Sequence, residues 1–237
     1  MTDLILRPHQ SKACLKLNVH DRFALYFAVG TGKTIAGLAV IREQVARGNM
    51  RWLVVAPIPV IPGWIASARE WFPELRIWSP AKIYGKLDHR ATLASWGVTE
   101  YDPKDVENVC FREANIVILN PQLMIPRKIG TDARGRAIRQ DRPWVGSIYD
   151  GLIVDESDVL TSPRSETTKT FLRLAGRANK LILLSGLPSP KDALDLWAQG
   201  YALGCWQDKY FAFCQKYGRQ DRLDRKSTRL NSSHVSQ

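Results

Sequence analysis

A short glycine-rich segment, AVGTGKT at residues 28–34, has the residue types and spacing for binding phosphate. Gly30 and Gly32 would let backbone N–H groups curl around a phosphate group, because glycine readily adopts the positive φ angles of such a loop. Lys33 could reach the β- and γ-phosphates of a nucleotide, and the Thr34 hydroxyl could bind Mg²⁺. The segment therefore predicts a phosphate loop, with a chance glycine turn as the alternative.

A pair of carboxylates in GLIVDESD, residues 151–158, could supply the remaining chemistry. Asp155 would complete the shell of a Mg²⁺ ion, and Glu156 would orient and deprotonate an attacking water. Acidic residues at the end of a strand are also common as simple turns or helix caps. Combined with the phosphate loop, however, the pair favours hydrolysis of a nucleotide.

Short apolar runs without polar alternation predict the strands that must position these groups. Continuous runs of β-branched residues and leucine are typical of parallel strands buried on both faces. Five such runs occur, at residues 23–27, 52–56, 116–119, 152–154 and 181–184.

Helical patterns lie between these runs. After the first run, apolar residues recur at helical spacing and Gly48 provides a C-terminal stop; they are Ile35, Leu38, Ala39 and Val45. Near the end of the chain, Ser189 could cap and Pro190 could open a second helix, whose apolar face is Leu194, Trp197 and Tyr201.

Strands that alternate with helices predict an α/β fold, a mainly parallel sheet with helices on both faces. Ligands of such sheets bind beyond the carboxyl ends of the strands, where both motifs would meet. Residues 78–114 and 126–143 are longer excursions from the sheet. The second holds six basic and two acidic residues. It predicts a solvated loop, with contact to a polyanion as the alternative.

Composition limits the class of protein. The chain has 237 residues, 45% of them hydrophobic and 24% charged, which suits one α/β domain or a domain and a fragment. No apolar run reaches the roughly 18 residues of a membrane span, and the N-terminus lacks a signal-peptide pattern. We therefore expect an intracellular, cytoplasmic protein with no membrane partner. Four cysteines without zinc-site spacing are expected to be reduced thiols: Cys14, Cys110, Cys205 and Cys214.

Six motifs occur in the order and approximate spacing of those in superfamily-two helicases, and resemble most the Swi/Snf branch of DNA-dependent ATPases and its phage and bacterial relatives. The resemblance spans residues 4 to about 217. It implies a RecA-like P-loop NTPase lobe that uses ATP and Mg²⁺ to drive movement on double-stranded DNA. The motifs are LRPHQ (6–10), AVGTGKT (28–34), LVVAPIPVIPGW (53–64), VILNPQLM (117–124), IVDESD (153–158) and LLSGLPSPKDALDLW (183–197).

The resemblance also implies a role for single residues. Gln10 matches the glutamine that reads the adenine edge, Asp155 the Mg²⁺ ligand and Glu156 the catalytic carboxylate. Ser185 and Gly186 match a motif that links the nucleotide to the nucleic-acid side. The phosphate-loop positions are Gly30, Thr31, Gly32, Lys33 and Thr34, with Thr34 also a metal ligand; the positions in backbone-contacting motifs are Pro57, Trp64 and Asn120. For Trp64, packing of a helix is the alternative.

Three positions depart from the family pattern. Phe27 stands where the general phosphate-loop signature has its first glycine. Asp158 replaces a histidine that is common in the Swi/Snf branch, and Leu187 replaces a usual threonine. The last two departures concern coupling more than hydrolysis.

The resemblance further implies a second lobe that supplies arginines to the transition state. We recognise no pattern for it after residue 217, so residues 1–223 are expected to be the N-terminal ATP-binding lobe, which binds Mg·ATP weakly and hydrolyses it poorly alone. Residues 224–237, DRKSTRLNSSHVSQ, read as a translated sequencing adapter and are expected to be disordered. The tail contributes +2 to the net charge of +11, and the remaining +9 favours a polyanionic partner as well as a solvated basic surface.

Other functions stay open at this point. A strand-separating helicase of the DEAD/DEAH type, or a translocase subunit of a restriction enzyme, would carry similar motifs. Outside motors, a non-helicase P-loop nucleotide enzyme or an inactive nucleic-acid binding module remain alternatives.

Overall fold

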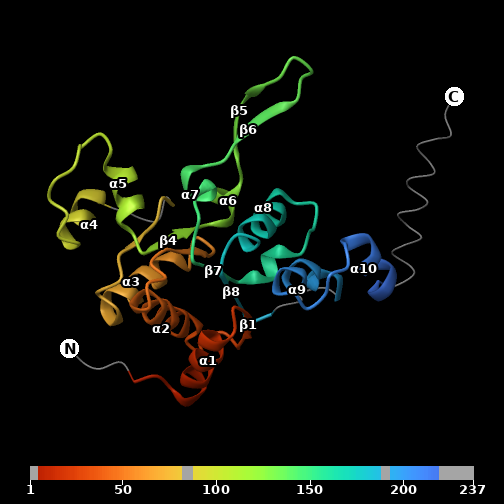
Figure 1. The fold of residues 1–237 in the computed structure, drawn as a ribbon, viewed down its shortest axis with the longest axis horizontal. Coiled ribbons are helices and arrows are strands. Elements are labelled where there is room, and N and C mark those ends of the chain that lie inside the picture. The colour runs from red at the N-terminus through yellow and green to blue at the C-terminus, as the bar shows by residue number, and fades with distance from the viewer. Residues whose placement is uncertain (1–4, 82–87, 188–192, 219–237) are drawn as a thin grey trace.

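A six-stranded parallel sheet forms the centre of the computed structural model, which describes residues 5–81, 88–187 and 193–218 (Figure 1). The strand order is β1-β8-β7-β2-β4-β3, and each neighbouring pair is parallel. The five predicted runs are all strands, and a two-residue edge strand, β3, was not predicted. The bounds are β1 Arg22–Tyr26, β2 Trp52–Val55, β3 Ile77–Trp78, β4 Ile116–Leu119, β7 Gly151–Asp155 and β8 Lys180–Ser185.

Alternate residues of each strand enter two separate cores, one on each face of the sheet. In β2, Leu53 and Val55 belong to one core, whereas Trp52 and Val54 belong to the other. This two-sided burial explains why the strands read as continuous apolar runs. The predicted α/β fold, a mainly parallel sheet with helices on both faces, is confirmed.

Helices α1 to α3 contribute to one core, and α5, α8, α9 and α10 to the other. The α-helices are α1 Pro8–Val19, α2 Lys33–Ala46, α3 Ile61–Trp71, α4 His89–Ser95, α5 Val106–Glu113, α6 Pro121–Met124, α7 Pro143–Gly146, α8 Glu166–Ala175, α9 Trp197–Leu203 and α10 Tyr210–Tyr217. Two 3₁₀ turns are η1 Ser157–Leu160 and η2 Ala193–Leu196. The helix predicted after the first strand is α2, and Gly48 follows it with φ 97°.

Lys180 fixes the end of α1 against the sheet. Its ammonium group is buried and donates to the carbonyl oxygens of Leu17 at 3.1 Å and His20 at 2.8 Å. A cation at a helix C-terminus interacts favourably with the helix dipole and satisfies carbonyls that lack a helical partner. Helix α1 carries Gln10, so this contact helps to set the position of a predicted site residue.

The excursion at residues 126–143 is exposed to solvent, as we predicted, but it is an antiparallel hairpin rather than a loop. Strands β5 (Arg127–Thr131) and β6 (Ala137–Gln140) pair with each other and form a sheet of their own. The ribbon extends away from the body of the protein (Figure 1). Because both its faces are exposed, its sequence lacks the apolar alternation by which strands are recognised.

Two expectations fall outside the described residues: the Ser189 cap with Pro190, and the disordered tail at 224–237. The described part of the late helical region begins with η2 and continues as α9. All four cysteines are free, as expected. Of the helices within the described ranges, none has the length and apolarity to cross a membrane.

Candidate nucleotide-binding and hydrolytic site

The predicted phosphate loop lies between the carboxyl end of β1 and the first turn of α2. Gly30 and Gly32 adopt φ angles of 79° and 82°, the left-handed region that glycine tolerates best. Gly32 is also the N-cap of α2, so the free N–H groups and positive dipole end of this helix face the loop. The loop geometry therefore suits an anion.

The side chain of Lys33 reaches back to the start of the phosphate loop. Its ammonium group donates to the carbonyl oxygens of Phe27 at 2.9 Å and Ala28 at 3.3 Å, and the side chain is buried. The Thr31 hydroxyl donates to the same Ala28 oxygen at 2.8 Å. Thr34, in the first turn of α2, is half-buried. These hydrogen bonds hold the phosphate loop in a compact turn around the Lys33 ammonium group.

Gln10 lies directly against the loop. Its amide nitrogen donates to the carbonyl oxygens of Thr31 at 3.2 Å and Gly32 at 3.4 Å, and its amide oxygen accepts from the Arg7 N–H at 2.8 Å. A Cβ atom at Gly32 would lie 2.1 Å from the Gln10 nitrogen. Gln10 therefore positions the phosphate loop in this structure, and its contact with adenine stays a proposal.

Asp155 ends β7, two strands away from β1 in the sheet. Its carboxylate is 5% exposed and accepts hydrogen bonds from the Trp64 indole N–H at 2.8 Å and the Glu156 N–H at 3.1 Å. Lys33 interacts with it electrostatically. The two motifs are thus brought together, as the sequence predicted.

Trp64 is placed differently from our expectation that it contacts a nucleic acid. The side chain is fully buried, and its ring would lie 3.0 Å from a Cβ at Gly37 of α2. The absence of a side chain at Gly37 leaves room for the indole beside Asp155. We correct the prediction: Trp64 packs between helices and orients the carboxylate of Asp155, and it has no exposed surface for a ligand.

The environment of Asp155 disfavours its charge. Burial raises the pKa of this carboxyl group above its ordinary value, because the charged form loses contact with water. The hydrogen bonds from Trp64 and from the Glu156 backbone, and the charge of Lys33, act in the opposite direction but do not reverse the shift. A nearby cation would stabilise the charged form further.

Glu156 has an unusual backbone conformation. With φ 50° and ψ 59° it lies in the left-handed region, and among the described residues it is the one non-glycine residue with positive φ. Such a conformation costs on the order of 1–3 kcal/mol and persists where surrounding structure enforces it. The turn directs the chain from β7 into η1 and leaves Glu156 half-buried beside Asp155.

Ser185 and Gly186 lie against the phosphate loop. The Ser185 carbonyl accepts from the Phe27 N–H at 3.1 Å, and its hydroxyl accepts from the Leu187 N–H at 3.0 Å. A Cβ at Gly186 would lie 3.2 Å from the Val29 side chain. The end of β8 is therefore in direct contact with the loop, which suits the coupling role that the resemblance implies.

Gln199 is a site residue that the sequence did not reveal. This buried side chain on α9 accepts hydrogen bonds from the Tyr26 hydroxyl at 3.0 Å and the Ser157 hydroxyl at 2.8 Å. Tyr26 ends β1 before the phosphate loop, and Ser157 follows Glu156. Gln199 thus connects both motifs to the core that contains α5, α8, α9 and α10. In the sequence it is only an isolated glutamine within a helical pattern.

Pro57 and Asn120 follow the carboxyl ends of β2 and β4, on the same edge of the sheet as the phosphate loop. Pro57 is half-buried, whereas Asn120 is 5% exposed and donates from its amide to Gln122. One carboxylate oxygen of Asp158 is buried without a hydrogen-bond partner among the described residues.

The residues at this edge fit a nucleotide with Mg²⁺. The loop glycines adopt the positive φ angles of an anion-binding turn, and a hydroxyl and a carboxylate, Thr34 and Asp155, are ligands of the hard type that Mg²⁺ prefers. No group of three His, Cys, Asp or Glu side chains in the described ranges could hold a metal by itself.

Comparison with known proteins agrees with the family that the motifs resemble. The family model described as SNF2-related domain matches residues 25–200. Helicase SWR1 of Mycosarcoma maydis is 25% identical over 178 residues, which are 74% of this chain and 8% of that protein. The chain thus spans a small part of this relative.

Two solved structures share the fold. The Sulfolobus solfataricus SWI2/SNF2 ATPase core in complex with dsDNA has a TM-score of 0.68 at 18% identity, over 91% of this chain and 39% of that chain. The Sulfolobus solfataricus SWI2/SNF2 ATPase core domain has a TM-score of 0.62 at 18% identity, over 90% of this chain and 38% of that chain. At this identity the likeness concerns the fold alone.

Proposed function

Because the chain belongs to the SNF2-related domain family, we propose that it is the nucleotide-binding lobe of an ATP-driven motor that moves on double-stranded DNA. The observation that carries the proposal is the meeting of three groups at one edge of the sheet. These are the loop at Gly30–Thr34, the carboxylate of Asp155 and the half-buried Glu156.

The geometry assigns a task to each group. The N–H groups of the loop and the Lys33 ammonium would bind the phosphates, with Lys33 exchanging its bonds to Phe27 and Ala28 for bonds to phosphate oxygens. Thr34 and Asp155 would hold Mg²⁺, which when bound neutralises charge on the phosphates. Glu156, next to Asp155 in the chain, would orient the attacking water and accept its proton.

Coupling to DNA is proposed through Ser185 and Gly186. Ser185 is hydrogen-bonded to Phe27, directly before the phosphate loop, and Gly186 lies close to Val29 of the loop, so a change in the loop on nucleotide binding would displace the end of β8. A close contact between packed groups transmits small displacements because protein interiors are densely packed.

Duplex DNA is the proposed partner. The archaeal structural neighbour is described in complex with dsDNA, and this chain carries a net charge of +9 outside the tail. Pro57 and Asn120 lie at the edge of the sheet that carries the phosphate loop. Backbone groups at these positions remain our candidates for contacts with phosphates.

A second lobe is part of the proposal. The chain aligns with 39% of the archaeal ATPase core, which leaves room in such a core for a further domain. We propose that this domain supplies the positive charge that the transition state needs. Turnover is therefore expected to be low in the chain alone and to rise when both lobes are present.

Glu156→Gln tests the hydrolytic part of the proposal in a protein that carries both lobes. We expect loss of DNA-dependent ATP turnover by about 10²-fold or more, as for removal of a general base, with binding of Mg·ATP unchanged. Glu70→Gln, at an exposed glutamate of α3, is the matched control and should behave as the unaltered protein. Equal turnover in the two variants would exclude Glu156 as the catalytic carboxylate.

A further inference from the structure

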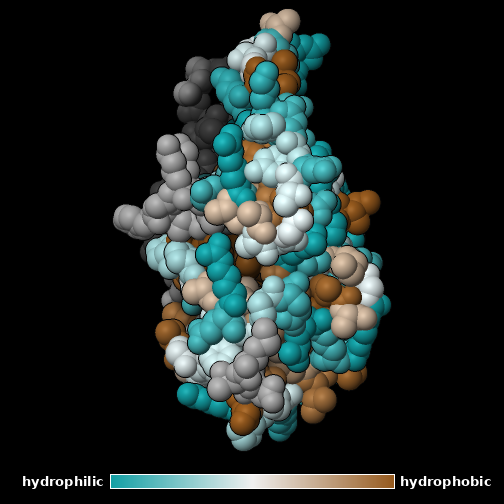
Figure 2. All heavy atoms as spheres, turned by 90° about the vertical axis from the view of Figure 1, so that its left-hand side faces the viewer, coloured by the Kyte–Doolittle hydropathy of each residue, from teal (hydrophilic) through white to brown (hydrophobic). Residues whose placement is uncertain are grey.

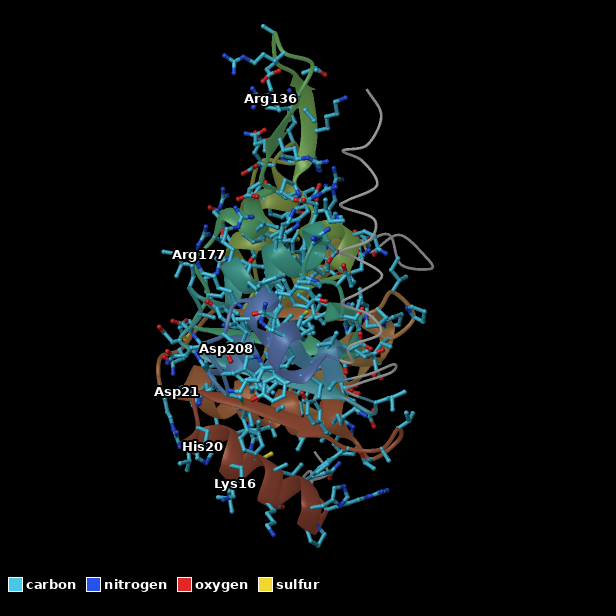
Figure 3. The ribbon with its side chains drawn as sticks, turned by 90° about the vertical axis from the view of Figure 1, so that its right-hand side faces the viewer. Lys16, His20, Asp21, Arg136, Arg177 and Asp208 are labelled. Atoms are coloured by element: carbon cyan, nitrogen blue, oxygen red, sulfur yellow. The ribbon has the colours of Figure 1, made fainter. Side chains whose placement is uncertain are left out.

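The hairpin of β5 and β6, residues 127–142, is a second feature with a distinctive charge pattern; we call it the basic ribbon. It projects from the lobe in Figure 1, and Figure 3 shows Arg136 at the far end of the molecule from Lys16. The ribbon leaves the sheet after β4 and α6, seven residues beyond Asn120. It therefore starts near the edge that carries the phosphate loop.

The basic ribbon contributes little to the core. Eight of the nine residues of its strands are exposed, including Ile129 at 58% and Ile138 at 45%. In Figure 2 the projecting end is mostly hydrophilic, with a few hydrophobic side chains among the polar ones. An isolated two-stranded ribbon is marginally stable in water. Its exposure thus calls for an explanation other than folding.

The acidic residues of the basic ribbon are already engaged. Asp132 accepts hydrogen bonds from the backbone N–H groups of Arg134 at 2.9 Å and Arg136 at 2.8 Å. Asp141 accepts two hydrogen bonds from the guanidinium of Arg173 on α8, at 2.6 and 2.8 Å. Neither carboxylate neutralises the strand residues of the ribbon.

Arg136 lies 3.8 Å from the Asp132 carboxylate, and the other five basic side chains of the ribbon form no ion pair with any described residue: Arg127, Lys128, Arg134, Arg139 and Arg142. Glu166, which interacts electrostatically with Arg139, is paired with Lys169 at 2.8 Å. The positive charge of the ribbon is therefore mostly uncompensated within the described chain.

Like charges also face each other across the ribbon. Lys128 and Arg139 are directly opposite in the strand register, an arrangement that destabilises a hairpin. At its base, burial and the charge of Arg127 lower the pKa of Arg142, whose Nε is buried with no hydrogen-bond partner among the described residues. A bound polyanion would convert these repulsions into favourable interactions.

We propose that the basic ribbon binds the phosphate backbone of duplex DNA, as an additional contact of the motor proposed above. A two-stranded ribbon has the width that a DNA major groove admits. Five of its six basic residues are arginines, whose planar fork matches phosphate oxygens. Residues 127–142 contain no aromatic side chain on which the bases of a single strand could stack. Charge and shape together favour a duplex.

The test removes the facing pair with the double variant Lys128→Gln/Arg139→Gln. The matched control is Lys16→Gln/Arg177→Gln, which removes one lysine and one arginine from exposed positions on α1 and after α8. Binding of the 237-residue chain to a labelled duplex of about 20 base pairs is measured at several salt concentrations. A single strand and polyglutamate serve as competing probes.

The ribbon variant should bind duplex on the order of ten-fold more weakly. The slope of its log binding constant against log salt concentration should be smaller by roughly 1.8, because each lost phosphate contact removes about 0.9. The control should match the unaltered chain, and the thermal midpoints of all three should agree. If the unaltered chain binds duplex and the ribbon variant binds equally well, the ribbon proposal is wrong while the proposed function stands. No salt-sensitive duplex binding by the unaltered chain contradicts both. A loss confined to the single strand or to polyglutamate excludes duplex as the partner.

Discussion

At the scale of single residues, the site depends on how Asp155 carries its charge. Burial makes the charged carboxylate unfavourable, and the Trp64 indole and the Glu156 N–H partly offset this cost. A carboxylate held in this way is ready to gain from a cation, since the cation supplies the stabilisation that water no longer provides. Trp64 is then a positioning residue, because it acts through Asp155.

Trp64→Phe should change the pH dependence of Mg·ATP binding. Loss of the indole donor raises the pKa of Asp155 further, since that hydrogen bond stabilises the charged form. Metal binding needs the deprotonated carboxylate. As the pH is lowered, the variant should therefore lose affinity for Mg·ATP at a higher pH than the unaltered chain does. The measurement is Mg·ATP affinity as a function of pH.

Trp52→Phe is the control for this experiment. Trp52 is also buried, but its indole donates to the Asn49 carbonyl at 3.1 Å rather than to a carboxylate. Its pH profile should match that of the unaltered chain. A Trp64→Phe profile that coincides with the control would show that the indole does not tune Asp155.

At the scale of elements, the junction of β1, the phosphate loop and α2 depends on Gly32. Two independent requirements meet there: a φ of 82° and the space that the Gln10 amide occupies. Helix α1, fixed at its other end by Lys180, holds Gln10 in this contact. The loop conformation is therefore set by an element that precedes β1.

Gly32→Ala should lower the free energy of unfolding by about 1–2 kcal/mol, the usual cost of a non-glycine residue in the left-handed region. It should also abolish nucleotide binding, because the new Cβ displaces Gln10 from the loop. Gly48→Ala provides the control, since Gly48 has φ 97° and open space around it. We expect Gly48→Ala to lower the free energy of unfolding measured in urea and to leave nucleotide affinity unchanged. Equal loss of affinity in the two variants would mean that backbone strain, and not the displacement of Gln10, causes the loss.

At the scale of the whole molecule, the sequence predicted the features that depend on short stretches of chain, namely the buried strands and the short motifs. The strands were visible because burial on both faces makes each one a continuous apolar run, and Lys33 and Asp155 were visible because their motifs are short. The basic ribbon was missed because both its faces are exposed, so no alternation marks its strands. Gln199 was missed because its partners, Tyr26 and Ser157, are distant in the chain.

Trp64 shows a different limit of the sequence. The resemblance of its motif suggested a contact with nucleic acid, with packing of a helix as the alternative, but the choice between core and surface depended on the space at Gly37 and on the carboxylate of Asp155. Both belong to other elements. Only packing in three dimensions could decide its role.

The central claim, that the edge of this sheet binds Mg·ATP through the phosphate loop, is tested most directly by the affinity of Lys33→Ala for Mg·ATP in equilibrium titration. We predict a loss of roughly 10- to 100-fold, since charged hydrogen bonds contribute about 1.5–3 kcal/mol. Lys16→Ala, at an exposed lysine of α1, should bind as the unaltered chain does. Equal affinity of Lys33→Ala and Lys16→Ala, or no binding of Mg·ATP by the unaltered chain, would contradict the account.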